Sequence, residues 1–365
     1  GYKNWLAGEP NNFANNEDAV QMTTAGGWND VSTTSTATCL ICERALPIGC
    51  DDADACTTAD TCTAAGSCVG AGGCNDGNPC TADACVSAGK CSHTTTAEGK
   101  ACGGTGVCTA GSCVIGTLAQ PAPSCQAIAS VVPAAKSALY WLDVDGDGAK
   151  VALQSYCEMT IDGGGWTLVA VVSDDKKDTW TWNQRLYWTT DTTTFGSVSA
   201  LNKDFKSPLH HDLNSKDVAF VHAPSGIWAA YHDVSNGKVS FAAQLASVAG
   251  PKCYVGADAG FALSAGTLKV GGNLCSDKFF FHPADHDGNA NSCTGDSNPE
   301  HTFGPGWSAN SGNGCPFDDP GSSSGLGPLS NDATHERTNI GFGGPLNLNK
   351  GKKDTGSNRM EIYVR

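Results

Sequence analysis

Carboxylate and amide side chains gather near the amino end of the sequence at spacings that suit a metal ion. The residues are Glu9, Asn11, Glu17, Asn29 and Asp30. All five offer hard oxygen atoms, the donors that calcium prefers, and calcium takes six to eight of them. Five side chains fall short of that number, and the hydroxyl groups of a sugar can supply the remainder. The pattern therefore predicts a calcium site near the amino end of the chain.

Pro10 lies between two of these ligands and has a positional use. A proline there holds Glu9 and Asn11 splayed toward one side, and a cis Glu9–Pro10 bond is expected to help. The alternative interpretation is an Asn- and Thr-rich loop that matches a metal site by chance, since short motifs often do so.

A second acidic run, DVDGDG at 143–148, has the alternating aspartates of a calcium loop. Gln154 stands where such a loop needs a bidentate glutamate, so a plain turn is favoured. The apolar runs on both sides of it predict a β-hairpin, which a bond between Cys125 and Cys157 is expected to close. His210 and His211 are adjacent, and adjacent side chains diverge on most backbones. We therefore expect surface histidines there and no metal pair.

The composition narrows the class of partner. The 365 residues carry a formal charge of −15, only 16% of them are charged, and 45 are glycine. Nucleic acid and anionic membranes need basic patches, so neither is an expected partner. The acidity suits calcium, or simply keeps a secreted protein soluble. The loop-rich composition is β-leaning, and nine tryptophans and 19 cysteines argue against disorder.

Cysteine usage indicates an extracellular protein. Eleven of the 19 cysteines lie between Cys50 and Cys113, a density that persists as disulfides only in an oxidising compartment. Zinc is disfavoured, because the gaps are mostly five residues and His93 is the only histidine in the stretch. The six later cysteines are expected in disulfides: Cys125, Cys157, Cys253, Cys275, Cys293 and Cys315. No run of about 18 apolar residues predicts a membrane span.

The sequence divides into three segments, which we take as residues 1–46, 47–118 and 119–365. The middle one repeats internally, as CDDADACTTADTC at 50–62 is followed by CNDGNPCTADAC at 74–85. It resembles the cysteine-rich repeats of secreted bacterial surface proteins. Its units are too small to bury a core, so disulfides must hold them. We expect a stiff spacer there, followed by a proline-containing linker at 119–125.

Residues 1–46 resemble the C-terminal half of a C-type lectin domain. The matching features are the Glu-Pro-Asn triplet at 9–11, Glu17, and the Trp-Asn-Asp triplet at 28–30. The resemblance implies that two vicinal hydroxyls of a sugar such as mannose or N-acetylglucosamine bind the calcium ion, and that Trp28 lies in the core. It further implies that Glu9, Asn11, Glu17 and Asn29 contact the sugar. It also implies that Cys42 pairs with a cysteine upstream of Gly1 and that the chain is a piece of something longer. Ala19 and Thr33 stand where the family has its second cysteine pair.

Residues 119–365 resemble the fibrinogen-like domain of the intelectins, the X-type lectins. The resemblance rests on CEMTIDGGGWTLVA at 157–170, TTFGSVSALNKDFKSPLHHDLNSKDVAFVHAP at 193–224 and the closing NRMEIYVR. Intelectins bind the terminal diols of microbial sugars through calcium, and the Asn-Pro-Glu-His run at 298–301 is similar to their calcium motif. Asp204 and Asp318, or its neighbour Asp319, match further calcium positions. Asp285, Asp287 and Asn289 resemble the calcium loop of fibrinogen-related domains.

These matches imply roles for particular side chains. Asn298, Glu300 and His301 would hold the ion and contact the sugar, although His301 could bond only the sugar, because calcium seldom accepts imidazole. The aromatic box that the family places over the sugar is not visible; only Trp307 and Phe317 are near, and Trp307 is taken as the candidate for contact with the sugar. The SANSGNGC stretch at 308–315 lacks the acidic ligand of the family, where Asn310 or Asn313 could substitute. For the acidic loops the alternative is a solvated turn.

The expected protein is mainly β or α+β and multidomain: a partial C-type lectin fold, a disulfide-rich stalk and a fibrinogen-like domain. No hydrolase motif is present, and both flanking segments resemble sugar-binding families. We therefore expect a secreted or surface lectin that requires Ca²⁺, binds glycans and is no enzyme. It would act as an oligomer or within a longer surface assembly, since paired weak sites gain avidity. The alternatives are a filament or scaffold subunit with degenerate lectin folds and, less favoured, a glycan-processing enzyme.

Overall fold

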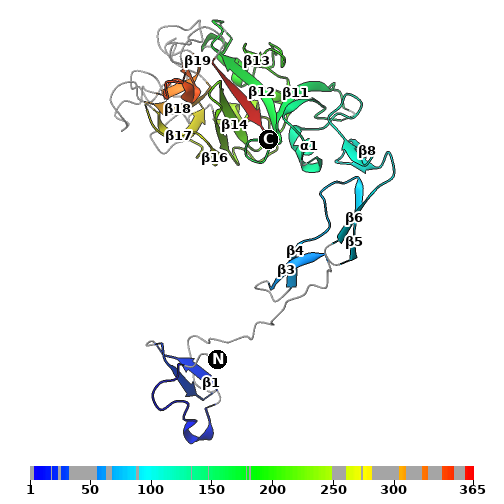
Figure 1. Cartoon of the computed structure of the whole chain (residues 1–365). Coiled ribbons are helices and arrows are strands. Elements are labelled where there is room, and N and C mark those ends of the chain that lie inside the picture. The colour runs from blue at the N-terminus through cyan, green and yellow to red at the C-terminus, as the bar shows by residue number, and fades with distance from the viewer. Residues whose placement is uncertain are drawn as a thin grey trace. The chain divides into compact units, whose positions relative to one another are not determined.

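The computed structural model divides into two compact units, residues 1–73 with 87–90 and residues 74–86 with 91–365. Each is considered by itself. Disulfides and short hairpins dominate its first third, and a large twisted sheet dominates the rest (Figure 1). The residues it describes are 4–17, 19–23, 26–32, 56–62, 68–87, 90–132, 134–146, 148–177, 179–180, 182–248, 260–272, 274–281, 304–309, 323–327, 339–348 and 358–365.

The first unit contains two antiparallel hairpins. Strands β1 (Ala19–Met22) and β2 (Trp28–Val31) follow the short 3-10 helix η1 (Phe13–Asn15). Trp5 meets Trp28 edge to face, with ring centroids 5.8 Å apart. The second hairpin pairs β3 (Thr57–Cys62) with β4 (Cys68–Gly72).

We call the cysteine-rich stretch between Cys50 and Cys113 the cysteine array, and the second unit begins with the later part of it. Its strands are β5 (Thr81–Ser87), β6 (Lys90–Thr95), β7 (Ala101–Cys102), β8 (Gly106–Thr109) and β9 (Ser112–Val114). Disulfides join Cys74 to Cys91, Cys80 to Cys108 and Cys102 to Cys113. Sulfur atoms provide the small core here, because Cys80, Cys102 and Cys108 are the buried members of its cluster.

An eight-stranded sheet forms the centre of the second unit. Its order is β10-β11-β12-β21-β14-β15-β16, with β13 paired to β12. The terminal strand β21 lies between β12 and β14, so the end of the chain occupies the middle of the sheet (Figure 1, red). The bounds are β10 (Ala138–Leu142), β11 (Leu153–Glu158), β12 (Trp166–Ser173), β13 (Phe205–Lys206), β14 (Val218–Ala223), β15 (Ile227–Tyr231), β16 (Ala265–Gly266) and β21 (Arg359–Val364).

The expected hairpin around 143–148 is present. Leu142 pairs with Leu153 and Ala138 with Cys157 in an antiparallel register. The expected disulfide joins Cys157 to Cys125, which begins helix α1 (Cys125–Val131). The hairpin is therefore stapled to a helix that packs against β12.

The expected linker at 119–125 is wrong, because this segment belongs to the fold. The backbone N–H of Ala122 donates to the carbonyl oxygen of Trp141 at 3.0 Å, and Asp143 donates back to Ala122 at 2.8 Å. Ala122 is fully buried, and Ser124 caps helix α1 by accepting from the N–H of Ala127. Prolines favour extended backbone, but extended backbone also suits a chain lying alongside a strand.

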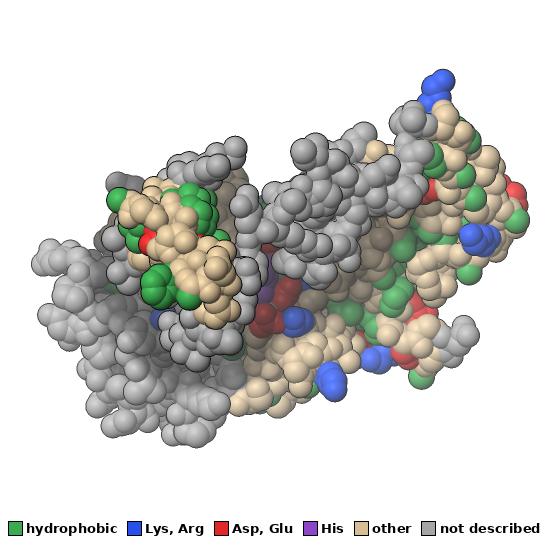
Figure 2. Space-filling view, turned by 90° about the horizontal axis from the view of Figure 1, so that it is seen from below, with side chains coloured by type: hydrophobic (Ala, Val, Ile, Leu, Met, Phe, Trp, Pro, Cys, Tyr) green, Lys and Arg blue, Asp and Glu red, His purple; other side chains and the backbone are tan. Residues whose placement is uncertain are grey.

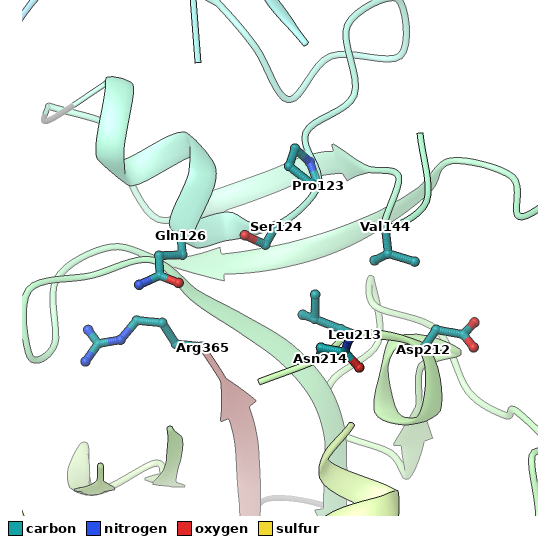
Figure 3. Close-up of a pocket in the computed structure, with 8 residues that line it drawn as sticks. All are labelled: Pro123, Ser124, Gln126, Val144, Asp212, Leu213, Asn214 and Arg365. Carbon is teal, nitrogen blue, oxygen red and sulfur yellow. The ribbon is translucent and has the colours of Figure 1, made fainter. Parts of the chain in front are cut away.

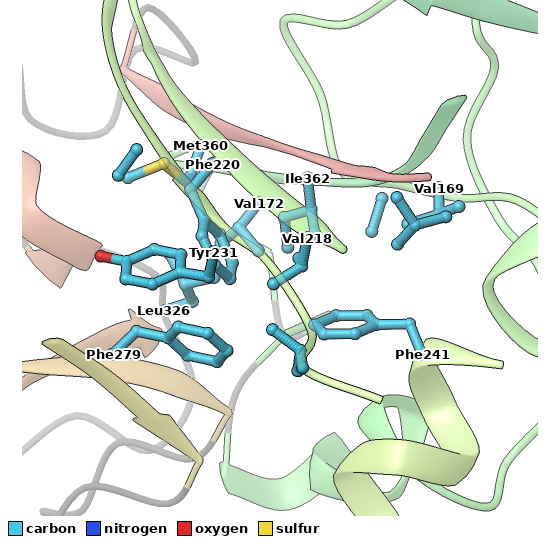
Figure 4. Packing of buried hydrophobic residues seen from close by; sticks show 14 of the residues in the cluster. Val169, Val172, Val218, Phe220, Tyr231, Phe241, Phe279, Leu326, Met360 and Ile362 are labelled. Atoms are coloured by element: carbon cyan, nitrogen blue, oxygen red, sulfur yellow. The ribbon is translucent and has the colours of Figure 1, made fainter. Parts of the chain in front are cut away.

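A second sheet and short helices complete the core. The sheet runs β17 (Leu274–Phe281), β18 (Pro305–Ala309), β19 (Ser323–Gly327) and β20 (Asn339–Ile340). The helices are η2 (Trp182–Trp188), α2 (Leu209–Asp212), α3 (Phe241–Val248) and η3 (Gly341–Gly343). Figure 4 shows Phe279 of β17 and Phe241 of α3 packed against apolar side chains of the large sheet. Among the described residues, no helix is long and apolar enough to cross a membrane.

Candidate functional site

Asp30 ties the loop at 9–12 to strand β2. Its side chain is buried, and its two oxygens accept the backbone N–H groups of Asn11 at 3.0 Å and Asn12 at 2.7 Å. Burial acts to raise the pKa of Asp30, but these N–H groups outweigh it and hold the pKa below its usual value. The Asp30 carboxylate is thus kept charged at the base of the loop.

Glu9 brings a second carboxyl group against Asp30. Burial and the neighbouring Asp30 raise the pKa of Glu9, while the side chain and backbone N–H of Asn11 act in the opposite direction. Glu9 Oε2 is buried and has no hydrogen-bond partner among the described residues. The expected cis bond joins Glu9 to Pro10. Two facing carboxyl groups with an orphaned buried oxygen are the arrangement that a cation resolves.

Glu17 and Asn29 are less closely joined to this pair. Glu17 Oε2 accepts the N–H of Phe13 at 2.7 Å, and its own N–H donates to Asn12 Oδ1 at 3.0 Å. Among the described residues, Glu17 does not form a cluster with Glu9 and Asp30 in which three side chains lie close enough to hold one ion. Asn29 lies beside Asp30 on β2, and neighbours on a strand face opposite ways. The structure brings Glu9, Asn11 and Asp30 together, and Glu17 braces the same loop.

Among the described residues of the second unit, Asp204 is the candidate calcium ligand, and Trp307 is the candidate for contact with the sugar. It is buried, and its Oδ1 accepts the N–H of Ser173 at the end of β12 at 2.9 Å. Sequence reasoning missed its neighbour Asp174, which is also buried and accepts the side-chain amide of Asn358 at 2.9 Å. The signal was present in the acidic pair that ends the apolar run VAVVSDD.

The other candidates of this segment lie outside the described residues. They are Asn298, Glu300, His301, Asp285, Asp287, Asn289 and Asp318, together with Cys253, Cys293 and Cys315. Cys275 is described and is disulfide-bonded.

Trp307 does not line a sugar site, which corrects the expectation from the sequence. Its side chain is fully buried in the main core. The indole Nε1 donates to the hydroxyl of Tyr231 at 2.8 Å, and the ring meets Phe220 edge to face. A residue without exposed surface cannot stack on a ligand, so Trp307 has a packing role.

His210 also differs from the expectation of surface histidines, whereas His211 beside it is half-buried. His210 is fully buried, and its Nε2 lies 3.1 Å from the carbonyl oxygen of Trp188. Burial lowers the pKa of His210 to about 3. Burial also lowers the pKa of Lys206, to about 8, and its ammonium donates to the carbonyl oxygen of Asp191. These basic side chains secure the segment around η2.

A polar pocket of about 200 Å³ lies beside α1 and the end of β21. Figure 3 shows Ser124, Gln126, Asn214 and Arg365 around it, with Leu213 and Val144 at the far side. The Arg365 guanidinium is already engaged by Asp162 and Asp217 and by two carbonyl oxygens. The pocket therefore offers no unused cation for an anionic ligand.

The described surface in Figure 2 shows no patch of clustered Lys and Arg side chains. On the face in Figure 2, Lys and Arg side chains are scattered singly over the described part of the second unit. This matches the formal charge of −15. A nucleic-acid interface would need them gathered into one patch.

No family model matches the sequence. Among solved structures, the fibrinogen-like globe domain of human ANGPTL6 is similar, with 13% sequence identity and a TM-score of 0.33. The similarity covers 67% of this chain and 95% of that one. A TM-score this low leaves the family of the chain open, so the proposals below stand on its residues and their geometry.

Proposed function

We propose that the protein is a secreted, calcium-dependent carbohydrate-binding protein. The observation that carries the proposal is the pairing of Glu9 with Asp30, which leaves Glu9 Oε2 buried and without a partner among the described residues. Holding two carboxyl groups together in this way is costly without a positive charge. Their setting among carboxylate and amide oxygens favours calcium.

The residues present fit such an ion. Glu9, Asn11 and Asp30 would hold it, and Glu17 and Asn29 are the further candidates on the same loop and strand. The ion would supply Lewis acidity toward a pair of sugar hydroxyl groups. Asp30 keeps the loop in place through the N–H groups of Asn11 and Asn12. Asn11 is exposed, so its amide is available to a ligand.

The other parts of the chain support binding in a second way. Asp204 and the candidates at 285–289, 298–301 and 318 would form calcium sites in the second unit. The array would act as the spacer between two binding heads. A single small sugar site binds weakly, and two sites on one spacer, or an oligomer, raise avidity through effective concentration. The disulfides support an oxidising, extracellular setting for the chain.

The test is calcium titration of the full chain together with a glycan array run with and without chelator. Asn11→Ala and Glu300→Ala should each weaken sugar retention without loss of folding. Asp143→Asn is the matched control, because Asp143 is half-buried in the turn between β10 and β11 and is none of the proposed ligands, so the change should leave retention unchanged. Calcium bound without chelator-sensitive glycan retention would favour a scaffold role, and release of reducing ends would indicate an enzyme. Absence of bound calcium would overturn the proposal.

A further inference from the structure

Two carboxylates and one imidazole meet on the β5–β6 hairpin of the cysteine array. Asp83 lies on β5, His93 on β6, and Asp76 in the turn that precedes β5. His93 Nδ1 is 2.8 Å from Asp83 Oδ1 and 3.5 Å from Asp76 Oδ2. One ligand atom from each of the three residues lies within 4.8 Å of the others.

The other carboxylate oxygens are occupied by the hairpin itself. Asp76 Oδ1 accepts the N–H of Asn78 at 2.8 Å and the hydroxyl of Thr81 at 2.9 Å. Asp83 Oδ2 accepts the N–H of Asp76 at 3.1 Å. Each aspartate is thus oriented by one oxygen, and its second oxygen faces His93.

A disulfide fixes the frame that carries these groups. Cys74 and Cys91 are joined, and each stands two residues before one of the ligands, Asp76 and His93 respectively. Because the bond locks the turn to β6, the three side chains meet without ordering a long flexible loop. Preorganisation of this kind lowers the entropic cost of capturing an ion.

We propose that Asp76, Asp83 and His93 form a binding site for a divalent transition metal of the zinc class. Zinc bonds of about 2.0–2.1 Å in a tetrahedron place ligand atoms about 3.3 Å apart. The two distances from His93 Nδ1 bracket that value. Imidazole suits zinc, copper and nickel far better than calcium. This site is therefore separate from the calcium chemistry proposed for the Glu9 loop.

The site is open on its outer side. The side chains of His93, Asp76 and Asp83 are 38%, 31% and 17% exposed. Three protein ligands leave a fourth position for water or for a donor from another molecule. A solvent-facing position also means that the ion can enter and leave without opening the hairpin.

A protonated His93 held between the two aspartates is the competing state. The hydrogen bond that His93 donates to Asp83 raises the pKa of His93, so the same carboxylates that favour a metal also favour a proton. The metal has to displace that proton and use the freed Nδ1 lone pair. The number of zinc ions bound per chain distinguishes the two states, because the protonated state binds none.

The test uses the full chain at neutral pH with calcium saturating, so that zinc is measured apart from the calcium sites. Zinc is titrated by calorimetry, and cobalt is used as a spectroscopic probe of coordination. One zinc per chain is expected, with at least about tenfold weaker binding in His93→Gln and in Asp83→Asn. His232→Gln is the matched control, since His232 is 36% exposed and its Nε2 lies 2.6 Å from Asp162, yet it belongs to no such group of three ligands within the described part of the chain.

Folding and metal binding are separated by a second measurement. Zinc should protect His93 of the wild-type chain from carbethoxylation, read by mass spectrometry, and should leave the reactivity of His232 unchanged. This readout needs no variant to fold. Absence of bound zinc, equal zinc affinity in folded His93→Gln, or failure of zinc to protect His93 would each overturn the proposal.

Discussion

Trp307 Nε1 donates a 2.8 Å hydrogen bond to the hydroxyl of Tyr231 in the buried core. That hydroxyl in turn donates to the carbonyl oxygen of Asp277 at 2.5 Å. The three residues lie on β18, β15 and β17, so this chain of hydrogen bonds joins the small sheet to the large one. Burial raises the pKa of Tyr231 far above its usual value, which keeps the hydroxyl neutral and able to donate.

Trp307→Phe should destabilise the second unit without altering sugar retention. The change removes one buried hydrogen bond and leaves space beside Phe220 and Phe342, for a cost of about 2–4 kcal/mol. Chemical denaturation followed by fluorescence measures it. Trp228→Phe is the control, because Trp228 is only partly buried and should lose less. A loss of glycan retention in a Trp307→Phe chain of unchanged stability would contradict the core role.

Glu9→Gln should weaken calcium binding at the first unit by at least about tenfold, or about 1.4 kcal/mol. The substitution keeps the shape of the side chain and removes the charge that faces Asp30. Calorimetric titration with calcium measures the effect. Glu98→Gln serves as the comparison, since Glu98 accepts the N–H of Ala110 in the array and takes no part in the loop. Equal affinity in Glu9→Gln and wild type would remove Glu9 from the site.

The sequence predicted those features that depend on local pattern. The apolar runs around 143–148 and the two cysteines beside them were enough to predict the hairpin and the Cys125–Cys157 bond, which the structure confirms. The spacing also predicted that Glu9, Asn11 and Asp30 come together, but it grouped Glu17 and Asn29 with them, and the structure joins those two less closely. Metal binding at that loop stays a prediction.

Features that depend on distant partners could not be read from the sequence. The prolines at 121 and 123 have the same local signature in a linker and in a segment docked on β10, and only the bonds from Ala122 to the hairpin distinguish them. Trp307 and His210 are buried by strands and helices far away in sequence. The facing of Asp76 and His93 depends on a disulfide partner that spacing alone does not identify.

His210 should make the second unit less stable in acid. Its folded pKa is about 3, against about 6.5 unfolded, so its neutral form is required for folding. The stabilisation is complete above about pH 6.5 and falls as the pH is lowered toward 3, by at most about 1.4 kcal/mol per pH unit. Between pH 7 and pH 5, the free energy of unfolding of the wild-type chain should therefore fall by about 2 kcal/mol more than that of His210→Gln.

Urea unfolding at several pH values, with chelator present, measures that difference. His93→Gln gives a control of opposite sign, because the hydrogen bond that His93 donates to Asp83 raises the pKa of His93. Its contribution is present at acid pH and is lost as the pH rises through the raised pKa. A pH-independent difference between wild type and His210→Gln would mean that His210 is protonated or solvated in the folded chain.

Removal of the Cys125–Cys157 bond should lower the stability of the second unit by about 3–4 kcal/mol. The bond closes a loop of sequence separation 32, and the chain-entropy relation gives this magnitude for a loop of that length. Both sulfur atoms are buried, so the Cys125→Ala/Cys157→Ala double variant is preferred to a single change that leaves a free thiol.

A Cys102→Ala/Cys113→Ala variant is the comparison, and chemical denaturation of both double variants measures the loss of stability in each region. The second pair closes a separation of only 11, so its loss should cost less and act on the array. Equal losses from both pairs would show that loop length does not govern the effect.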